Sequence, residues 1–208
     1  MPGSIRQAGF NSPPADPFTF FPLARADFPT MLRWLNNPAV SKWWGEPPAS
    51  IDELEGKHVP RLDGREQVYG FIAHCAETPM GYLQWYRLGT EPDHPAVGLA
   101  PASSAAIDVF IGEDDYRHRG LGSVMIRAFL TEIVFAEPDV KHCAIDPCVD
   151  NTAAIAAYRK TAFREIGLAP NPHENCISQI MLIDRSALVS DGVAEAAAEA
   201  ADADQYQE

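Results

Sequence analysis

The sequence lacks any long hydrophobic run. No stretch of the 208 residues approaches the roughly 20 consecutive apolar residues that a membrane-spanning helix needs. The N-terminal residues also lack the basic patch followed by an apolar run that is typical of a secretory signal peptide. We therefore expect a cytoplasmic protein that has no contact with a membrane.

Positive charge is also scarce. Only 16 lysine and arginine residues stand against 29 aspartate and glutamate residues, and the net charge is −13. Such a chain repels the phosphate backbone that dominates nucleic-acid binding, so we expect no nucleic-acid partner. A cationic small molecule is easier to accommodate. Part of the acidity lies at the C-terminus, in an Ala- and Glu-rich stretch without basic residues.

The sequence also lacks cysteine and histidine at the spacings of a metal site. The four cysteines are scattered, at Cys75, Cys143, Cys148 and Cys176, and three of them lie in or beside apolar segments. We expect buried free thiols at these positions. No histidine has the spacing of a metal ligand, and the sequence predicts no metal site.

What the sequence does contain is a strand followed by a glycine-rich turn. Residues 107–112 form an apolar run that leads through residues 113–116 to Arg117, Gly120 and Gly122. A turn of this kind before a helix leaves backbone N–H groups free, and the helix dipole adds positive potential, which suits a phosphate or pyrophosphate. The spacing is not that of a P-loop, and the third glycine of a dinucleotide fingerprint is absent.

A second block covers residues 146–163. Asp146 and a proline precede a segment in which Asp150 or Asn151 is expected to cap a helix. The following residues read A-I-A-A-Y-R-K-T-A-F, with Tyr158 on the predicted helix.

Together the R-x-x-G-x-G pattern and the second block resemble the GNAT family of N-acetyltransferases. The family pattern in the second block is A-I-x-x-Y-x-K-x-G-F, which this sequence matches except that Ala162 replaces the usual glycine. A left-handed backbone at that position would be strained by the alanine Cβ. The resemblance implies an acetyl-CoA-dependent N-acetyltransferase with a mixed α/β GNAT fold.

The resemblance also implies where acetyl-CoA binds. The strand would pair with the pantetheine, the amides of the turn would hold the pyrophosphate, and two arginines would add charge-assisted contacts. The residues expected at the cofactor are Val109, Phe110, Ile111, Arg117, His118, Arg119, Gly120, Leu121, Gly122, Ser123, Asn151 and Tyr158.

Acetylation of an amine requires a group that accepts a proton from the amine and an acid for the leaving group. Asp108 is unusual because aspartate is depleted in strands and costly to bury unpaired, and a substrate ammonium would compensate it. The alternative is a strand-edge aspartate bonded to nearby backbone. Asp146 is a second candidate for the base, and two facing carboxylates would raise each other's pKa. By resemblance Tyr158 is the general acid, and its alternative is a packed aromatic residue.

Within the family, the sequence is similar to the aminoglycoside 6'-N-acetyltransferases and to siderophore-pathway acyltransferases that act on hydroxylated lysine. Asp108 favours the former, and with them antibiotic resistance, because a carboxylate suits a polycationic amino sugar. The resemblance implies an acceptor pocket formed by Trp44, Phe71, Gln84, Tyr86, Asp108 and Asp146.

Other functions remain open. The loop at residues 89–98 keeps only Glu91 and Asp93 as acids, which favours weaker capture of a multiply charged drug. The alternatives are a housekeeping amine acetyltransferase, a siderophore-pathway acyltransferase of N-hydroxylysine, and a non-catalytic acyl-CoA-binding module.

The pattern along the chain predicts one folded domain. We expect a disordered lead-in over residues 1–17, a GNAT domain over residues 18–185 and an acidic tail over residues 186–208. Helices are expected after Asp27, Ser50, Gly120 and Asn151. Strands are expected near residues 18–23, 68–75, 80–88, 107–112, 142–145, 163–168 and 177–183. This order predicts a central, mostly antiparallel mixed sheet of six or seven strands flanked by four helices, in a monomer or homodimer.

Overall fold

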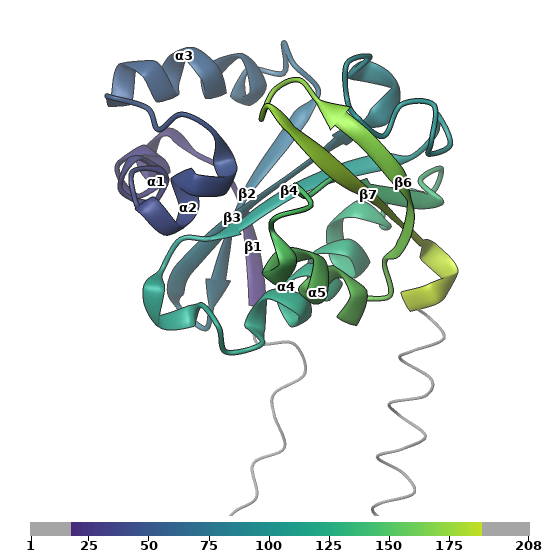
Figure 1. Ribbon diagram of the computed structural model, residues 1–208. Coiled ribbons are helices and arrows are strands. Elements are labelled where there is room, and N and C mark those ends of the chain that lie inside the picture. The colour runs from purple at the N-terminus through teal and green to yellow at the C-terminus, as the bar shows by residue number, and fades with distance from the viewer. Residues whose placement is uncertain (1–17, 189–208) are drawn as a thin grey trace, which may run out of the picture.

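The computed structural model describes residues 18–188, so the expected lead-in and nearly all of the expected acidic tail lie outside the described residues. Within that range the chain forms seven strands and five α-helices, and residues 185–188 are also helical (Figure 1). The strands are β1 (Phe18–Pro22), β2 (Val68–Cys75), β3 (Thr78–Arg87), β4 (Ala105–Ile111), β5 (His142–Ile145), β6 (Arg164–Asn171) and β7 (Cys176–Asp184). The α-helices are α1 (Phe28–Leu35), α2 (Pro38–Trp44), α3 (Ile51–Leu62), α4 (Leu121–Phe129) and α5 (Thr152–Lys160).

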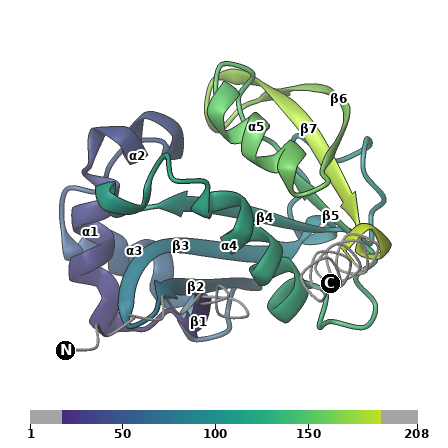
Figure 2. The ribbon, with the colours of Figure 1, turned by 90° about the horizontal axis from the view of Figure 1, so that it is seen from below.

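All seven strands belong to one sheet, in the order β1-β2-β3-β4-β5-β7-β6. Every neighbouring pair is antiparallel except β4 and β5, which are parallel. This parallel pair is short, since only Ala105 and Ala106 of β4 pair with β5. The remainder of β4 pairs with β3 alone, and Figure 2 shows β7 and α5 turned away from β4. The predicted mixed sheet is therefore confirmed, and it opens on one side of β4.

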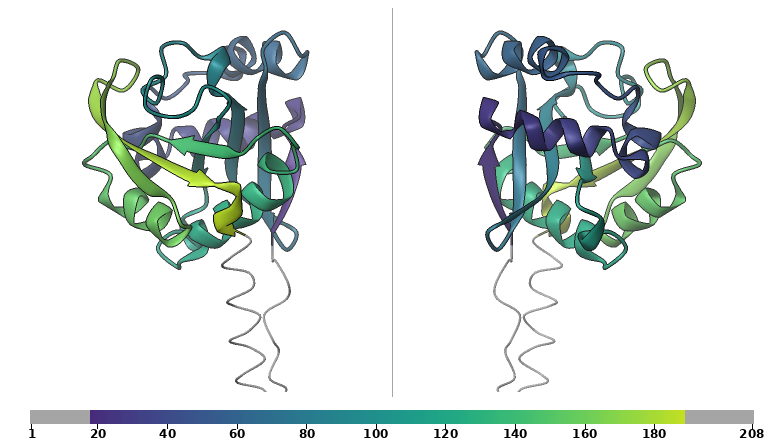
Figure 3. Two further views of the ribbon diagram at one scale, coloured as in Figure 1. Left: turned by 90° about the vertical axis from the view of Figure 1, so that its right-hand side faces the viewer. Right: turned by 90° about the vertical axis from the view of Figure 1, so that its left-hand side faces the viewer.

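Side chains alternate between the two faces of the sheet along each strand, so apolar residues lie on both faces. Helices cover both of these faces. Tyr82 and Phe110 pack with residues of α1 and α3, whereas Leu83 and Ile107 pack with Met125 and its neighbours on α4. The right-hand view of Figure 3 shows α1 crossing one face of the sheet. The face that α3 covers also carries Tyr82, Gln84 and Tyr86, which follow the same alternation.

Local signals placed most helix starts correctly. Ser50 Oγ accepts from Glu53 N at 3.2 Å and begins α3, and Asn151 Oδ1 accepts from Ala154 N at 3.2 Å and begins α5. The prediction of four helices is too low, because residues 38–44 form α2 and residues 185–188 are also helical. Asn37 caps this helix and Pro38 occupies its first position, so the proline that ends α1 also begins the next helix.

The prediction of free thiols is wrong for two of the four cysteines. Cys148 and Cys176 form a disulfide, with Cα atoms 6.0 Å apart across a sequence separation of 28 residues. The antiparallel pairing of β5 with β7 continues into a bridge between Cys148 and Ser178, which brings the two sulfur atoms together. Cys75 and Cys143 are free, and Cys143 is buried.

Among residues 18–188, none of the helices has the length and apolar character that crossing a membrane requires.

Candidate active site

A cavity of about 1090 Å³ lies where β4 separates from β5. One side of it is formed by β4, the loop before α4, and α5. The other side is formed by α2, α3 and the loop that precedes β4. The cavity therefore lies beside the part of β4, residues 107–111, that pairs only with β3.

The loop between β4 and α4 is built as the glycine pattern predicts. His118 and Gly120 both have a left-handed backbone, with φ of 60° and 78°, and Gly120 occupies the N-cap of α4. A side chain at Gly122 would meet only Ile111 Cδ1, at 3.7 Å, so packing within the protein does not require glycine there. The close approach of a ligand to the first turn of α4 would require it. The residues present thus fit the pyrophosphate of a coenzyme.

The two arginines of this loop have different roles in the structure. Arg117 Nη1 donates to the carbonyls of Ile111 and Gly112, at 3.1 and 3.2 Å, and Arg117 also pairs with Asp114. Arg117 therefore holds the loop onto the end of β4, although it still lines the cavity. Arg119 is exposed and, within residues 18–188, neither lines the cavity nor forms an ion pair.

Of the other residues expected at the cofactor, most face the cavity. The lining residues include Val109, Phe110, Ile111, His118, Gly120, Gly122, Ser123, Asn151 and Tyr158. Leu121 does not line it, because its side chain packs against the core.

Asp108 is held by its cross-strand neighbour. Gln84 on β3 lies opposite Asp108 on β4, and Gln84 Nε2 donates to Asp108 Oδ2 at 2.6 Å. The amide oxygen of Gln84 accepts from Arg61 Nη1 and from the Tyr82 hydroxyl, both at 2.9 Å. Gln84 therefore presents its amide hydrogens to Asp108 and fixes the carboxylate at the cavity wall.

The electrostatic surroundings of Asp108 suit a proton acceptor. Burial raises the pKa of Asp108 above its ordinary value and the nearby charge of Asp146 adds to the rise, while the hydrogen bond from Gln84 opposes it. A carboxylate with a raised pKa is a better base for an amine than an ordinary exposed one. The alternative of an aspartate bonded to backbone has no support, since the Asp108 carboxylate accepts its hydrogen bond from the Gln84 side chain.

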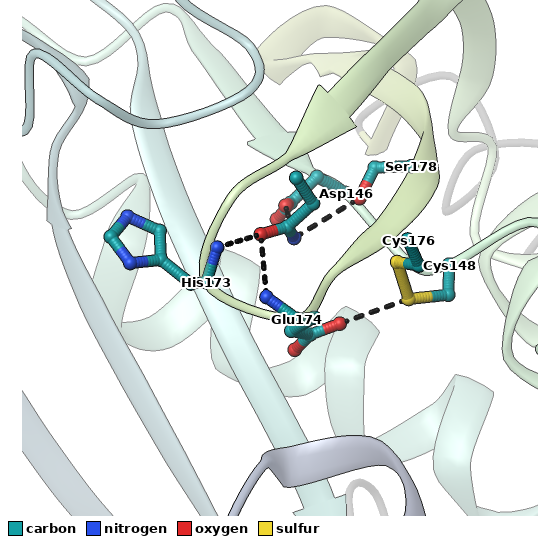
Figure 4. Close-up of a disulfide and its surroundings, with 7 residues drawn as sticks. Asp146, Cys148, His173, Glu174, Cys176 and Ser178 are labelled. Carbon is teal, nitrogen blue, oxygen red and sulfur yellow. Dashed lines mark hydrogen bonds between the residues drawn. A yellow bond between two sulfur atoms is a disulfide. The ribbon is translucent and has the colours of Figure 1, made fainter.

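Asp146, directly after β5, is the second carboxylate of the cavity. Asn171 Nδ2 donates to Asp146 Oδ2 at 3.1 Å and to Ser178 Oγ at 3.1 Å (Figure 4). The Asn171 oxygen accepts from the backbone N–H groups of His173 and Glu174, at 3.0 and 3.1 Å. The turn between β6 and β7 thus holds Asp146 from one side.

Glu174, on the same turn, adds a third carboxylate. Its Oε2 lies 3.1 Å from Cys148 Sγ, and a protonated carboxyl can donate to that sulfur, which has no hydrogen of its own. Partial burial raises the pKa of Glu174 to about 7, and the charges of Asp146 and Asp108 contribute to the rise. Three carboxyl groups therefore influence one another in this cavity.

Tyr158 lies on α5 and is buried, with its ring 5.9 Å from that of Phe163. Burial raises the pKa of its hydroxyl well above the ordinary value, and Asp108, Asp146 and Glu174 add to the rise. The hydroxyl therefore keeps its proton at neutral pH, as a general acid must before it acts.

The expected acceptor residues come together with one exception. Trp44, Gln84, Tyr86, Asp108 and Asp146 all line the cavity. Phe71 does not. Its ring packs 5.4 Å from that of Phe129 on α4, and the residue belongs to the core on that side of the sheet.

The structure brings further residues to the site that the sequence did not indicate. Lys57 and Arg61 reach the cavity from α3, His94 reaches it from the loop before β4, and Glu174 reaches it from the turn after β6. Lys57 and Arg61 are four residues apart and so share one helix face, which is a pattern visible in the sequence. Nothing in the sequence placed that face at the cavity.

Comparisons with known proteins show the family of this chain. The model of the acetyltransferase (GNAT) domain family matches residues 24–169. The chain is 28% identical over 166 residues to aminoglycoside N(6')-acetyltransferase type 1 of Klebsiella pneumoniae, a match that covers 76% of this chain and 79% of that protein.

Solved structures show the same fold. The crystal structure of aminoglycoside acetyltransferase AAC(6')-Ib in complex with coenzyme A superposes with a TM-score of 0.75 at 26% identity, covering 83% of this chain and 98% of that chain. The same enzyme with coenzyme A and kanamycin gives a TM-score of 0.74 at 25% identity, with coverage of 83% and 98%. With the family model matching most of the chain, this protein belongs to the GNAT family of acetyltransferases, whose enzymes use acetyl-CoA.

Proposed function

We propose that this acetyltransferase acetylates a primary amine of a small cationic molecule, and that an aminoglycoside 6'-amine is the first acceptor to test. The observation that carries the proposal is the set of carboxyl groups from Asp108, Asp146 and Glu174 on one cavity beside the glycine loop. A cationic amine is attracted to such a cavity. The net charge of −13 supports a cationic small molecule over a nucleic acid.

Acetyl-CoA supplies the acetyl thioester, and the residues of the chain would orient and deprotonate the amine. The amides at the start of α4 and the unpaired edge of β4 would hold the cofactor. Asp108, held by Gln84, would accept the proton of the substrate ammonium, directly or through a water molecule. Tyr158 would keep a proton available for the leaving group, on the side of the cavity that α5 forms.

Replacing Asp108 with Asn tests the proposed base. The Asp108→Asn change keeps the shape of the side chain and removes its ability to accept a proton, so we expect kcat/KM for the acceptor to fall by about 10²–10⁴-fold. The binding of acetyl-CoA, measured by calorimetry, should not change. Asp115→Asn is the matched control, because Asp115 is exposed in the turn before the glycine loop. Wild-type turnover by Asp108→Asn would contradict this role.

The acceptor itself is identified by a screen with acetyl-CoA over kanamycin-like aminoglycosides, polyamines and hydroxylysine. If kanamycin is acetylated, its minimum inhibitory concentration for bacteria that express the protein should rise. Absence of thioester consumption with every amine of the panel would count against the proposal.

One observation favours a second class of acceptor. Lys57 is exposed at the cavity and, within the described residues, makes no ion pair, and Arg61 lies on the same helix face. Two cations would repel one end of a polycation but would attract a carboxylate, as in an N-hydroxylysine acceptor of a siderophore pathway.

A comparison of lysine with cadaverine tests this second class, because the two amines differ only in this carboxylate. A preference for lysine that disappears in Lys57→Gln would support the second class, and a preference for cadaverine would exclude it.

A further inference from the structure

The loop before β4 brings one buried histidine to the acceptor side of the cavity. His94 is 9% exposed, and its ring lies 5.8 Å from that of Tyr86. The backbone holds it in place, because His94 N donates to the Glu91 carbonyl at 3.1 Å and Val97 N donates to the His94 carbonyl at 2.9 Å. The backbone of His94 is therefore fixed within the loop.

The hydrogen bonds of this ring define its tautomer. Ala96 N–H donates to His94 Nδ1 at 3.0 Å, so Nδ1 is an acceptor and the proton of the neutral ring lies on Nε2. Nε2 is buried and, among residues 18–188, makes no hydrogen bond of ordinary geometry. Asp146 Oδ1 lies 3.4 Å from it. The N–H group of Nε2 thus faces a carboxylate oxygen without an aligned hydrogen bond, and such bonds often tighten when a substrate binds.

Asp146 has one hydrogen-bond donor, from Asn171, and the N–H group of His94 faces it on another side. Asn171 contacts Oδ2, and His94 faces Oδ1 from a different element. The side chain of Asp146 is 12% exposed, so these two residues replace much of the water that an ionised carboxylate would otherwise bind. These two contacts restrain both oxygens of the carboxylate.

We propose that His94 is a positioning residue for acceptor acetylation, which donates from Nε2 to Asp146 and so holds a second carboxylate beside Asp108. The inference rests on the proposed function. Adjacent carboxylates ionise as a coupled pair, so a donor to one of them favours the doubly ionised pair that receives a substrate ammonium.

Several other groups face this pair. They are Tyr86 from β3, Glu91 from the loop of His94, Glu174 from the turn after β6, and Arg61 and Lys57 from α3. Glu91 and Glu174 are acidic and oppose ionisation of the pair, and the cations of α3 favour it from the side of Asp108. On the side of Asp146 the favourable contacts are those of His94 and Asn171, so a change at His94 should be measurable.

Two substitutions at His94 separate positioning from packing. His94→Leu removes the donor, and we expect an approximately tenfold increase in acceptor KM, the order that the loss of a hydrogen bond to a charged group predicts. The acidic limb of the pH profile of kcat/KM should move to higher pH, while KM for acetyl-CoA stays unchanged. His94→Gln retains an N–H donor and should restore both the acceptor KM and the pH profile for the most part.

His74→Leu is the matched control, because His74 lies on β2 against Phe21 and does not line the cavity. It should leave acceptor KM and the pH profile at their wild-type values. An unchanged acidic limb in His94→Leu, or equal impairment of the Gln and Leu variants, would overturn the proposal.

A second measurement does not depend on activity or on the folding of a His94 variant. The imidazole of His94 can be followed by nuclear magnetic resonance in the free protein, in the wild type and in Asp146→Asn. We expect the Nε2-protonated tautomer in the wild type and a lower pKa of His94 in Asp146→Asn, because a nearby carboxylate favours imidazolium. If the titration of His94 is the same in both proteins, the contact is refuted. If the wild type turns over no amine, the proposed function fails while this measurement still decides the contact.

Discussion

At the scale of single residues, Gly122 is required for the approach of a ligand and not for the packing of the protein. Gly120 needs its left-handed backbone, whereas a Cβ at Gly122 would meet only one side-chain atom at ordinary contact distance. Gly122 lies in the first turn of α4, where the free N–H groups would hold a pyrophosphate. The added methyl group would therefore interfere with the cofactor and not with the protein.

Gly122→Ala should therefore reduce cofactor binding without reducing stability. Alanine favours the helix by up to about 1 kcal/mol relative to glycine, so the melting temperature should stay the same or rise. KM for acetyl-CoA should increase by roughly tenfold or more, since the ligand loses close approach to the backbone. Gly56→Ala is the control, because Gly56 lies in α3 with no atom near its Cβ position and outside the cavity lining. It should raise stability and leave KM unchanged. A wild-type KM in Gly122→Ala would contradict the proposed position of the pyrophosphate.

At the scale of the elements, the residue that follows the end of α5 has a backbone conformation that a residue with a Cβ disfavours. Ala162 follows α5 with φ of 66°, in the left-handed region where the GNAT pattern has glycine. A Cβ in this conformation costs roughly 1–2 kcal/mol, and the strain predicted from the sequence is therefore present.

We expect Ala162→Gly to stabilise the protein. Relief of the left-handed strain exceeds the added flexibility of the unfolded chain, and a net gain of about 0.5–1 kcal/mol in the free energy of unfolding should follow. Urea denaturation measures it. Ala156→Gly supplies the control, since Ala156 is an exposed interior residue of the same helix and the same substitution there should destabilise by about 1 kcal/mol. Destabilisation by Ala162→Gly would show that the alanine side chain contributes more than its strain costs.

At the scale of the whole molecule, the disulfide connects the segment that follows β5 to the start of the neighbouring strand β7. Cys148 follows β5 and Cys176 begins β7, and the chain between them contains α5 and β6. Closing a loop of 28 residues in the unfolded chain reduces its entropy, and the expected stabilisation is about 2–4 kcal/mol. The disulfide also holds the turn that carries Glu174 and Asn171.

The double variant Cys148→Ser/Cys176→Ser should therefore lose about 2–4 kcal/mol of unfolding free energy. Dithiothreitol should lower the melting temperature of the wild type and leave that of the double variant unchanged. Cys75→Ser is the control, because Cys75 is a free cysteine and its loss should not change the response to the reductant. If the reductant has no effect on the wild type, the disulfide does not contribute to stability in solution.

The sequence by itself determined the family, the glycine loop, the cap at Asn151 and the identity of Asp108 and Tyr158 as candidate catalytic residues. These features depend on residues close together in the chain, where spacing reports directly on local backbone geometry and helix ends. The succession of helices and strands along the chain, apart from α2 and the helical residues 185–188, also followed from local patterns. The alternation of side chains along β3 and β4 also places Gln84 and Asp108 on one face once their register is known.

Only the tertiary structure decided which distant residues meet. The disulfide, the contact of His94 with Asp146, and the arrival of Lys57 and Arg61 at the cavity depend on sheet pairing and loop paths that span many residues. The same is true of Phe71, which the alternation of β2 turns toward α4 instead of the cavity. Local pattern carries no information about such contacts, because each of them depends on how two separately formed elements pack.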